Sequence, residues 1–181
     1  IRKYLKEFLS DRRVIEVNPI IWQIILNIFI LILFGLGVNA GSSLNNSFSN
    51  KISNSWVMGT FGWGLAVTLG VYAAKFSGAH INPAVTIGLL TSGEISSNKA
   101  FVYVLGQITG AFIGCIIIFL HYQPLWEGTK SNKILGVFAT SPSKPSKWSN
   151  LLSEIIGTFI LLFVLKFIGT NEFSDGLNPL I

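Results

Sequence analysis

Apolar residues occur in four long runs along the chain, and each run is long enough to cross a lipid bilayer. A helix needs about 20 apolar residues to span the hydrocarbon layer, which is about 30 Å thick. The first three runs contain no charged residue, whereas the fourth holds Glu154 and Lys166. The pattern predicts spans over residues 20–38, 56–74, 101–120 and 151–168. A fifth span is predicted to begin at "GLNPLI", where the sequence ends at Ile181.

Composition supports a membrane protein. The chain is 50% hydrophobic and 12% charged, whereas a soluble domain carries about 25% charged residues. The net charge of +5 comes from basic residues at the ends of the apolar runs, with no basic patch among exposed aromatics. A nucleic-acid partner is therefore not expected. Cys115 is the single cysteine, so no intramolecular disulfide can form, and we interpret it as a packed, inert thiol.

Basic residues are distributed unevenly between the two sides of the predicted spans. Lys and Arg are enriched on the cytoplasmic side of membrane proteins. Eight of the 13 lie on the side of the N-terminus, namely Arg2, Lys3, Lys6, Arg12, Arg13, Lys75, Lys99 and Lys166. The other five are Lys51, Lys130, Lys133, Lys144 and Lys147. The bias predicts a cytoplasmic N-terminus, and the apolar runs lead us to expect a plasma-membrane protein with several spans.

The segment "SGAHINPAVT" (77–86) interrupts the apolar pattern between the second and third runs. Asn82 is a favoured residue at the start of a helix, because its side-chain oxygen can accept from the free N–H groups of the first turn. Pro83 suits the first helical position, and Gly93 suits a helix end. The sequence predicts a helix of about ten residues over 82–91. Such a helix is about 15 Å long, so it can enter half of the bilayer but cannot span it.

The residues before this half-helix are not expected to be helical. Non-helical backbone at membrane depth is tolerated only where it is buried in protein or faces water. The carbonyls of Gly78, Ala79 and His80 are therefore expected to face a narrow aqueous channel. The N-terminus of the half-helix, with about half a positive charge, would point at the same channel. The alternative is an ordinary surface loop in which Asn-Pro forms a turn.

Three glycines in the third run lie at intervals of four residues. Gly106, Gly110 and Gly114 fall on one helix face, and small residues there allow two helix backbones to approach closely. Glycine is also common in membrane helices in general. The regular spacing nevertheless favours a packing surface.

"SGAHINPAVT" resembles the first signature loop of the aquaporin and glycerol facilitator family, the major intrinsic proteins. "FGWGLAVTLGVY", "GQITGAFIG" and "LSEIIGTFILLF" resemble the family's second, third and fourth helices. "IFLHYQPLW", "LGVFATSPS" and "FSDGLNPLI" resemble the glycerol-facilitator branch of Gram-positive bacteria. The resemblance covers about Trp22 to Ile181. It implies six membrane helices in two inverted halves, two half-helices that meet at mid-membrane, and homotetramers with one pore in each subunit.

The resemblance predicts the fold class and the organisation of the chain. The expected fold is an all-α membrane protein with an aquaporin-like right-handed helical bundle. About four transmembrane helices and one re-entrant half-helix of that fold fall within residues 1–181. The expected order is a cytoplasmic tail over 1–19, the first repeat over 20–120, an extracellular loop over 121–150, and the start of the second repeat over 151–181.

The same resemblance assigns roles to the residues of the signature loop. Asn82 is expected to donate its amide hydrogens to the passing solute. Pro83 and Ala84 are expected to fix the half-helix and its contact with the second half-helix. The carbonyls of residues 78–80 are expected to form one wall of the pore. His80 has the alternatives of a packed histidine or, less favoured, a titrating switch.

Two further residues match family positions outside the signature loop. Trp63 corresponds to an aromatic residue of the narrow filter in glycerol-selecting members, where its ring would contact the carbon backbone of a polyol. The alternative is a packed or lipid-facing tryptophan. Glu154 corresponds to an acidic residue that braces a re-entrant loop, and a simple buried acid is the alternative. Charges inside a membrane cost at least about 2.5–3.5 kcal/mol, so they usually have a partner.

The chain departs from the family pattern in two respects. Ile24 stands where the first helix usually has a second bracing glutamate, Gln23 is an imperfect substitute, and Asn27 stands where a small residue is usual. The bracing of the first loop is therefore in question. The printed residues also contain one Asn-Pro-Ala motif and not two. We interpret the sequence as either a fragment of a longer protein or the product of a broken gene.

The leading hypothesis is a passive channel for glycerol and other small uncharged solutes, with water as a further candidate. The alternative is a non-conducting fragment that only inserts or associates in the membrane. Glu154 and His80 form the one acid-base combination within the spans. The sequence has no metal-ligand spacing, nucleophile motif or phosphate-binding glycine loop. An enzyme, a metal site and a cofactor are therefore not expected.

Overall fold

The computed structural model describes residues 12–45, 55–74 and 77–168. Within them, four helices are long and apolar enough to cross a membrane: α2 Arg12–Ser43, α3 Ser55–Ala73, α5 Ser97–His121 and α7 Lys147–Ile168. Three shorter elements are α4 Pro83–Thr91, the 3-10 helix η2 Gln123–Leu125 and α6 Ser131–Phe138. The four predicted spans are thus confirmed as helices of sufficient length. The start of the predicted tail and the predicted fifth span lie outside the described residues.

The helix ends differ from the ends of the apolar runs. Helix α2 begins at Arg12 and contains Pro19, so it includes part of the segment predicted to be a tail over 1–19. Helix α5 begins at Ser97, where the Ser96 hydroxyl accepts a hydrogen bond from the Lys99 N–H. Hydropathy marks the lipid-facing length of a helix, whereas the backbone hydrogen bonds continue beyond it. The predicted loop over 121–150 likewise contains η2 and α6.

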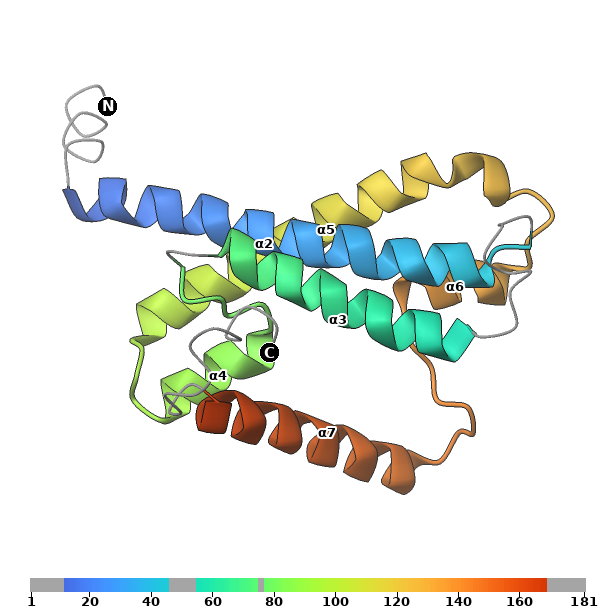
Figure 1. The fold of residues 1–181 in the computed structure, drawn as a ribbon. Helices are drawn as coiled ribbons and strands as arrows, with labels where there is room; N and C mark the ends of the chain where they lie inside the picture. The colour runs from blue at the N-terminus through green and yellow to red at the C-terminus, as the bar shows by residue number, and fades with distance from the viewer. Residues whose placement is uncertain (1–11, 46–54, 75–76, 169–181) are drawn as a thin grey trace.

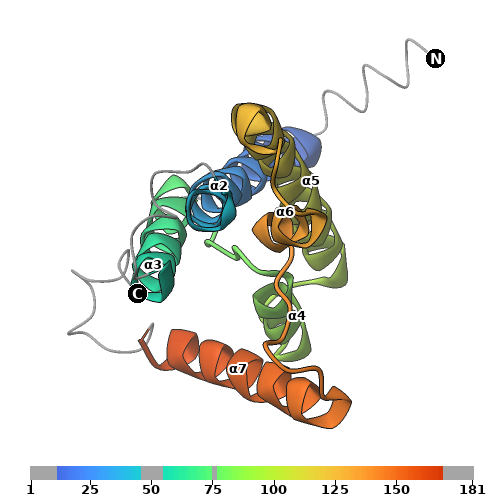
Figure 2. The same cartoon turned by 90° about the vertical axis from the view of Figure 1, so that its right-hand side faces the viewer.

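The helices form a packed group and one separate helix (Figures 1 and 2). Helix α2 lies between α3 and α5, and it contacts α6 near its C-terminal end. Helix α4 lies between α5 and α7 and does not run the length of the bundle (Figure 1). The loop after α3 and the loop before α5 both lie at the end where α2 begins. The chain therefore enters the bundle from that end and returns to it.

Two clusters of buried apolar side chains hold α2 to its neighbours. One cluster lies toward the C-terminal end of α2 and consists of Leu36, Ala40, Leu44, Ile118 and Val137. The other lies further toward the N-terminus of α2 and consists of Ile28, Leu31 and Ala66. Trp63 packs against both clusters. Together with Ile32, which also packs against both, it links the two parts of this core.

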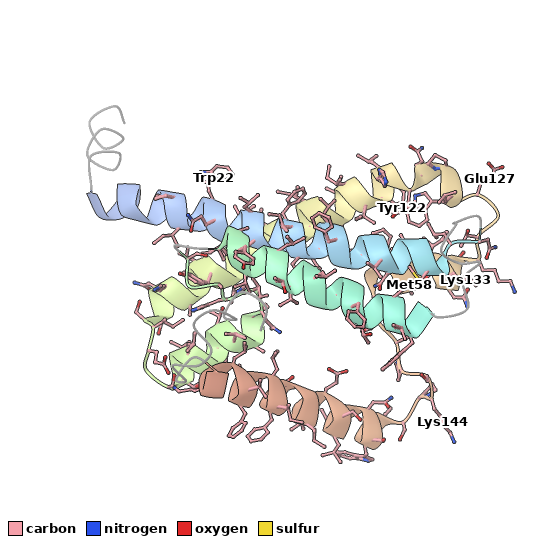
Figure 3. The ribbon with its side chains drawn as sticks, viewed as in Figure 1. Trp22, Met58, Tyr122, Glu127, Lys133 and Lys144 are labelled. Carbon is pink, nitrogen blue, oxygen red and sulfur yellow. The ribbon has the colours of Figure 1, made fainter. Side chains whose placement is uncertain are left out.

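Large apolar side chains cover much of the outer surface, as lipid contact allows. Trp22, Trp56 and Trp148 are 66%, 79% and 83% exposed and lie near the starts of three spans. Tryptophan is enriched at the two membrane interfaces. Figure 3 shows Trp22 near one end of the bundle, and Glu127 and Lys133 near the other. This distribution fits a helical bundle whose two ends face water.

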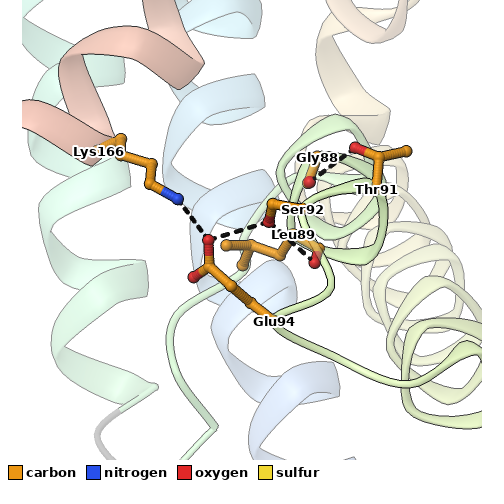
Figure 4. Close-up of polar contacts among 6 residues, drawn as sticks. All are labelled: Gly88, Leu89, Thr91, Ser92, Glu94 and Lys166. Carbon is orange, nitrogen blue, oxygen red and sulfur yellow. Dashed lines mark hydrogen bonds and ion pairs between the residues drawn. The ribbon is translucent and has the colours of Figure 1, made fainter.

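Helix α7 touches the rest of the described chain mainly through α4. Leu162 lies against Gly88, where an added Cβ atom would be 3.4 Å from its methyl groups. The Lys166 ammonium pairs with the Glu94 carboxylate, which also accepts from the Ser92 hydroxyl at 2.9 Å (Figure 4). None of the described side chains of α7 is buried. Within the described residues, this small contact is what joins α7 to the bundle.

Candidate functional site

The half-helix α4 begins with a cap formed by Asn82. Asn82 has extended backbone angles, with φ −150° and ψ 129°, and its side-chain oxygen accepts from the Ala84 N–H at 2.9 Å. Pro83 occupies the first helical position, where the N–H that proline lacks has no partner in any helix. The predicted cap is thus confirmed. The side-chain NH₂ group of Asn82 makes no hydrogen bond to the described residues and remains available as a donor.

The end of α4 also follows the prediction closely. The helix ends at Thr91, and the Ser92 N–H donates to the Gly88 carbonyl at 3.0 Å. Gly93 then has a φ of +78°, a left-handed conformation that glycine adopts without a steric penalty. The helix of nine residues is about 14 Å long, since each residue adds 1.5 Å. It is therefore too short to span a bilayer.

The loop before Asn82 is wound into two tight turns. Gly78 and Ala79 have positive φ angles of +75° and +52°, and an alanine in this region costs roughly 1–2 kcal/mol. The Ile81 N–H donates to the Ala79 carbonyl, and the Asn82 N–H donates to the His80 carbonyl, both at 2.7 Å. Such strain persists only where the surrounding structure holds the backbone in place.

Helix α5 supplies that support through two polar side chains. The Tyr103 hydroxyl donates to the Ser77 carbonyl at 2.6 Å. The Gln107 side-chain NH₂ donates to the His80 carbonyl and, at 3.1 Å, to the Thr86 hydroxyl. Tyr103 and Gln107 are each 2% exposed, so these bonds form away from solvent. Gln107 therefore joins the loop to the first turns of α4.

His80 is packed into the same support. It is 8% exposed, its ring centre lies 4.6 Å from that of Tyr103, and its Nδ1 lies 3.4 Å from the Thr86 hydroxyl. Its carbonyl already accepts from Asn82 and Gln107. The Gly78 carbonyl, by contrast, accepts no hydrogen bond from the described residues. The carbonyls of residues 78–80 were expected to act alike, but they differ in how many described groups donate to them.

Tyr103 and Gln107 were not among the predicted site residues. The sequence does carry a signal for them, because they are polar side chains four residues apart in an apolar run. That spacing places them on one face of a helix, and a polar group in a membrane helix needs an internal partner. What the sequence does not reveal is that the partners are carbonyls 26 and 27 residues away.

The structure answers the question raised by Ile24. Ile24 is 1% exposed, and its Cγ2 atom lies 2.9 Å from the position of a Cβ added at Gly106. It fills the space between α2 and α5, and within the described residues Tyr103 and Gln107 of α5 brace the loop. Asn27, one turn further along α2, is also 1% exposed, and its side-chain oxygen has no hydrogen-bond partner among the described residues.

Trp63 lies between α3 and α2, partly buried. A Cβ atom added at Gly35 would be 2.5 Å from the indole ring, so Gly35 provides the space that the ring occupies. The indole N–H donates to the side-chain oxygen of Asn39 at 3.0 Å. The ring is thus held by packing and by one hydrogen bond, and its N–H is directed toward protein.

The remaining predicted residues lie on the long helices. Gly106, Gly110 and Gly114 all face α2, and a Cβ at Gly110 would be 2.4 Å from the Ile25 carbonyl oxygen. These glycines therefore permit the close approach of α5 to α2. Glu154 lies exposed on α7, and the described residues provide it with no hydrogen bond or ion pair.

The chain combines a capped half-helix, a strained loop and an apolar helical bundle, and a comparison with known protein families agrees with these features. The family model for the major intrinsic proteins matches residues 21–176. The chain belongs to this family. The expected family and the expected aquaporin-like helical bundle are therefore confirmed.

Several bacterial members of the family are similar to this chain. It is 46% identical over 162 residues to the glycerol uptake facilitator protein of Bacillus subtilis. This alignment covers 88% of this chain and 58% of the Bacillus protein. It is 45% identical over 170 residues to the glycerol uptake facilitator protein 3 of Lactiplantibacillus plantarum. This alignment covers 91% of this chain and 70% of that relative. A probable glycerol uptake facilitator protein of Thermotoga maritima is 45% identical over 158 residues. This alignment covers 86% of this chain and 67% of that relative. The chain thus spans well under the full length of these relatives.

Proposed function

We propose that this protein, in its complete form, is a passive channel for glycerol and other small uncharged solutes, including water. The observation that carries this proposal is the state of Asn82. Its oxygen caps α4, which leaves the NH₂ group as a fixed donor at the start of a half-helix. The relatives named as glycerol uptake facilitators support glycerol as the solute.

The mechanism combines this donor with the other groups that we assign to the pore wall. The Asn82 NH₂ donates to a solute hydroxyl oxygen. The Gly78 carbonyl, to which none of the described residues donates, accepts from a solute O–H. The carbonyls of Ala79 and His80 contribute less, because Ile81, Asn82 and Gln107 already donate to them. The Trp63 ring offers an apolar surface to the carbon backbone of the solute. Pore width and the lining donors and acceptors decide selectivity in pores of this kind.

Cations are excluded by the same arrangement. The N-terminus of α4 carries about half a positive charge, which repels cations. Nothing in the mechanism consumes energy or converts the solute, so transport runs down the concentration gradient. We further propose a plasma-membrane location, a cytoplasmic N-terminus and a homotetramer in which each subunit has its own pore. Pro83 and Ala84 would contact a second half-helix, and Glu154 would brace its loop.

Stopped-flow light scattering on vesicles tests the transport proposal. Vesicles that hold the product of the complete reading frame are expected to take up glycerol faster than empty vesicles. Glycerol entry equal to that of empty vesicles would contradict the proposal and would favour the non-conducting alternative. Vesicles with the 181-residue chain alone, measured in parallel, reveal whether these residues suffice.

The variant Asn82→Asp tests the role of the fixed donor. A carboxylate cannot donate a hydrogen bond to the solute, and its negative charge attracts cations. Glycerol uptake is expected to fall, and cation leak to rise, in this variant. The matched control is Asn98→Asp, an exposed position in the first turn of α5. Unchanged uptake and selectivity in Asn82→Asp would contradict the assignment of Asn82 to the pore wall.

A further inference from the structure

We propose that Asn39 is a positioning residue that fixes the Trp63 indole and couples it to α6. This inference rests on the proposed function, because it assumes that the solute passes the Trp63 ring. Asn39 lies in α2, where its side chain is partly buried. It is an amide in an otherwise apolar neighbourhood, so the partners of its oxygen and its nitrogen reveal its role.

Each end of the Asn39 amide binds a different part of the protein. Its oxygen accepts from the Trp63 indole N–H at 3.0 Å. Its NH₂ group donates to the Val137 carbonyl at 3.2 Å, across 98 positions of the sequence. One side chain therefore connects the predicted filter aromatic on α3 with the short helix α6.

The Val137 carbonyl is a group that needs such a donor. It lies one residue before the C-terminal end of α6, and the last four carbonyls of a helix have no intrahelical partner. Val137 is fully buried, so water does not readily satisfy the carbonyl. Asn39 thus supplies a cap for α6, and the loss of this cap is expected to loosen the helix end.

Packing also connects two of these residues, Trp63 and Val137. Val137 belongs to the apolar cluster toward the C-terminal end of α2, and Trp63 and Phe138 pack against this cluster. On the other side, Gly35 leaves no space between the indole and α2. The ring can therefore move little without a change at the Asn39 end. A displacement of α6 would reach the ring through the amide and through the shared cluster.

This geometry determines which part of the indole a solute meets. The N–H is engaged by Asn39, so the solute contacts the hydrocarbon part of the ring. If Asn39 is replaced by an apolar residue, the N–H loses its partner and the ring can turn toward another acceptor, such as a solute hydroxyl. Asn39 is thus expected to influence the discrimination between glycerol and longer polyols.

Two substitutions separate the two bonds. Asn39→Leu has a similar size and removes both hydrogen bonds. Asn39→Asp keeps an acceptor for the indole but loses the donor to Val137. The matched control is Asn45→Leu. The Asn45 amide also bonds the segment between α5 and α7, since it donates to the Gly128 carbonyl at 2.9 Å and accepts from the Lys133 ammonium at 3.0 Å. Both bonds are exposed, so water can replace them, and Asn45 does not contact Trp63.

The first measurement is the indole N–H signal of the protein labelled with ¹⁵N-tryptophan, and it does not depend on transport. The chain has five tryptophans, and Trp63→Phe identifies the signal of Trp63. We expect this signal to shift in Asn39→Leu, to stay near that of a hydrogen-bonded indole in Asn39→Asp, and to be unchanged in Asn45→Leu. Faster hydrogen exchange of residues 131–139 is expected in both Asn39 variants. An unchanged Trp63 signal in Asn39→Leu would overturn the inference.

The second measurement is the ratio of glycerol to xylitol permeability in vesicles with the complete protein. Since a hydrogen bond contributes about 0.5–1.5 kcal/mol, Asn39→Leu is expected to change this ratio by roughly two- to thirteenfold. Asn45→Leu is expected to leave it unchanged. An altered indole signal with an unaltered ratio would overturn the link to selectivity. Absence of glycerol flux in the unsubstituted protein would instead contradict the proposed function, while the indole measurement would still test the positioning of Trp63.

Discussion

Helix α5 and helix α7 are both apolar enough to cross a membrane, yet they are packed in opposite ways. In α5, seven residues are buried, and Tyr103 and Gln107 bind the loop before α4. In α7, no described side chain is buried. The glycines differ in the same way, since Gly110 lies against a backbone carbonyl whereas Gly157 has no atom within 4 Å of an added Cβ.

Within the described residues, this difference agrees with what makes helices associate in lipid. Lipid tails are as apolar as leucine, so an exposed apolar side chain costs a membrane helix little. Association requires close packing at small residues and internal partners for polar groups. Helix α5 has both, and α7 is attached through Leu162 and the pair of Lys166 with Glu94. The predictions below test this contrast in order of decreasing effect.

The largest effect is expected from Gly110→Ala. The added Cβ atom would lie 2.4 Å from the Ile25 carbonyl oxygen, so α5 and α2 must separate. Overpacking of this kind is expected to cost about 3 kcal/mol of unfolding free energy. The measurement is the temperature at which Cys115, on α5, reacts with a thiol-specific fluorophore in detergent. In the control Gly157→Ala this temperature should not change, and equal behaviour of the two variants would refute the proposed contrast.

A smaller effect is expected from Gln107→Leu. The substitution keeps the apolar packing but removes the hydrogen bonds to the His80 carbonyl and the Thr86 hydroxyl. A loss of about 1–2 kcal/mol is expected, because the buried carbonyl loses a donor. Hydrogen-exchange mass spectrometry should reveal faster exchange over residues 77–86. The control is Thr109→Val, whose hydroxyl donates only to the Leu105 carbonyl of its own helix. Unchanged exchange in Gln107→Leu would mean that α5 does not brace the loop.

The smallest effect is expected from Glu94→Gln, which removes the ion pair with Lys166. Exposed pairs of this kind contribute little to stability, so the change should appear in the position of α7 and not in the unfolding temperature. The distribution of distances between spin labels on α4 and α7 is expected to broaden. The double substitution Glu94→Lys with Lys166→Glu should restore the narrow distribution, and Glu127→Gln should leave the distribution unchanged. A narrow distribution in Glu94→Gln would show that Leu162 is sufficient to hold α7.

The same pair predicts a dependence on pH. The hydrogen bonds from Lys166 and from the Ser92 hydroxyl hold the pKa of Glu94 below its usual range. A lowered pKa means that the attachment is complete above the pKa of a free glutamate, about 4.3, and is lost as the pH falls through the pKa in the folded protein. The distances should therefore stay constant near neutral pH and broaden only in acid. Broadening between pH 6 and 8 would contradict this assignment.

The sequence by itself determined the four apolar helices and the limits of α4. These features depend on neighbours a few residues apart: the Asn82 oxygen reaches the Ala84 N–H, Pro83 fits the first turn, and Gly93 permits the positive φ that follows the helix. The spacing of Gly106, Gly110 and Gly114 was also visible, because a helix repeats every 3.6 residues.

Only the tertiary structure decided which groups hold the site in place. Gln107 reaches a carbonyl 27 residues away, and Asn39 reaches one that is 98 residues away. No local pattern encodes such partners, because they depend on how α2, α3, α5 and α6 pack. Ile24 illustrates the same limit. Its apolar side chain left the bracing of the loop before α4 in question, and among the described residues the bracing comes from α5. A polar residue in a membrane span indicates that a partner exists, but the packing of the helices determines which group that partner is.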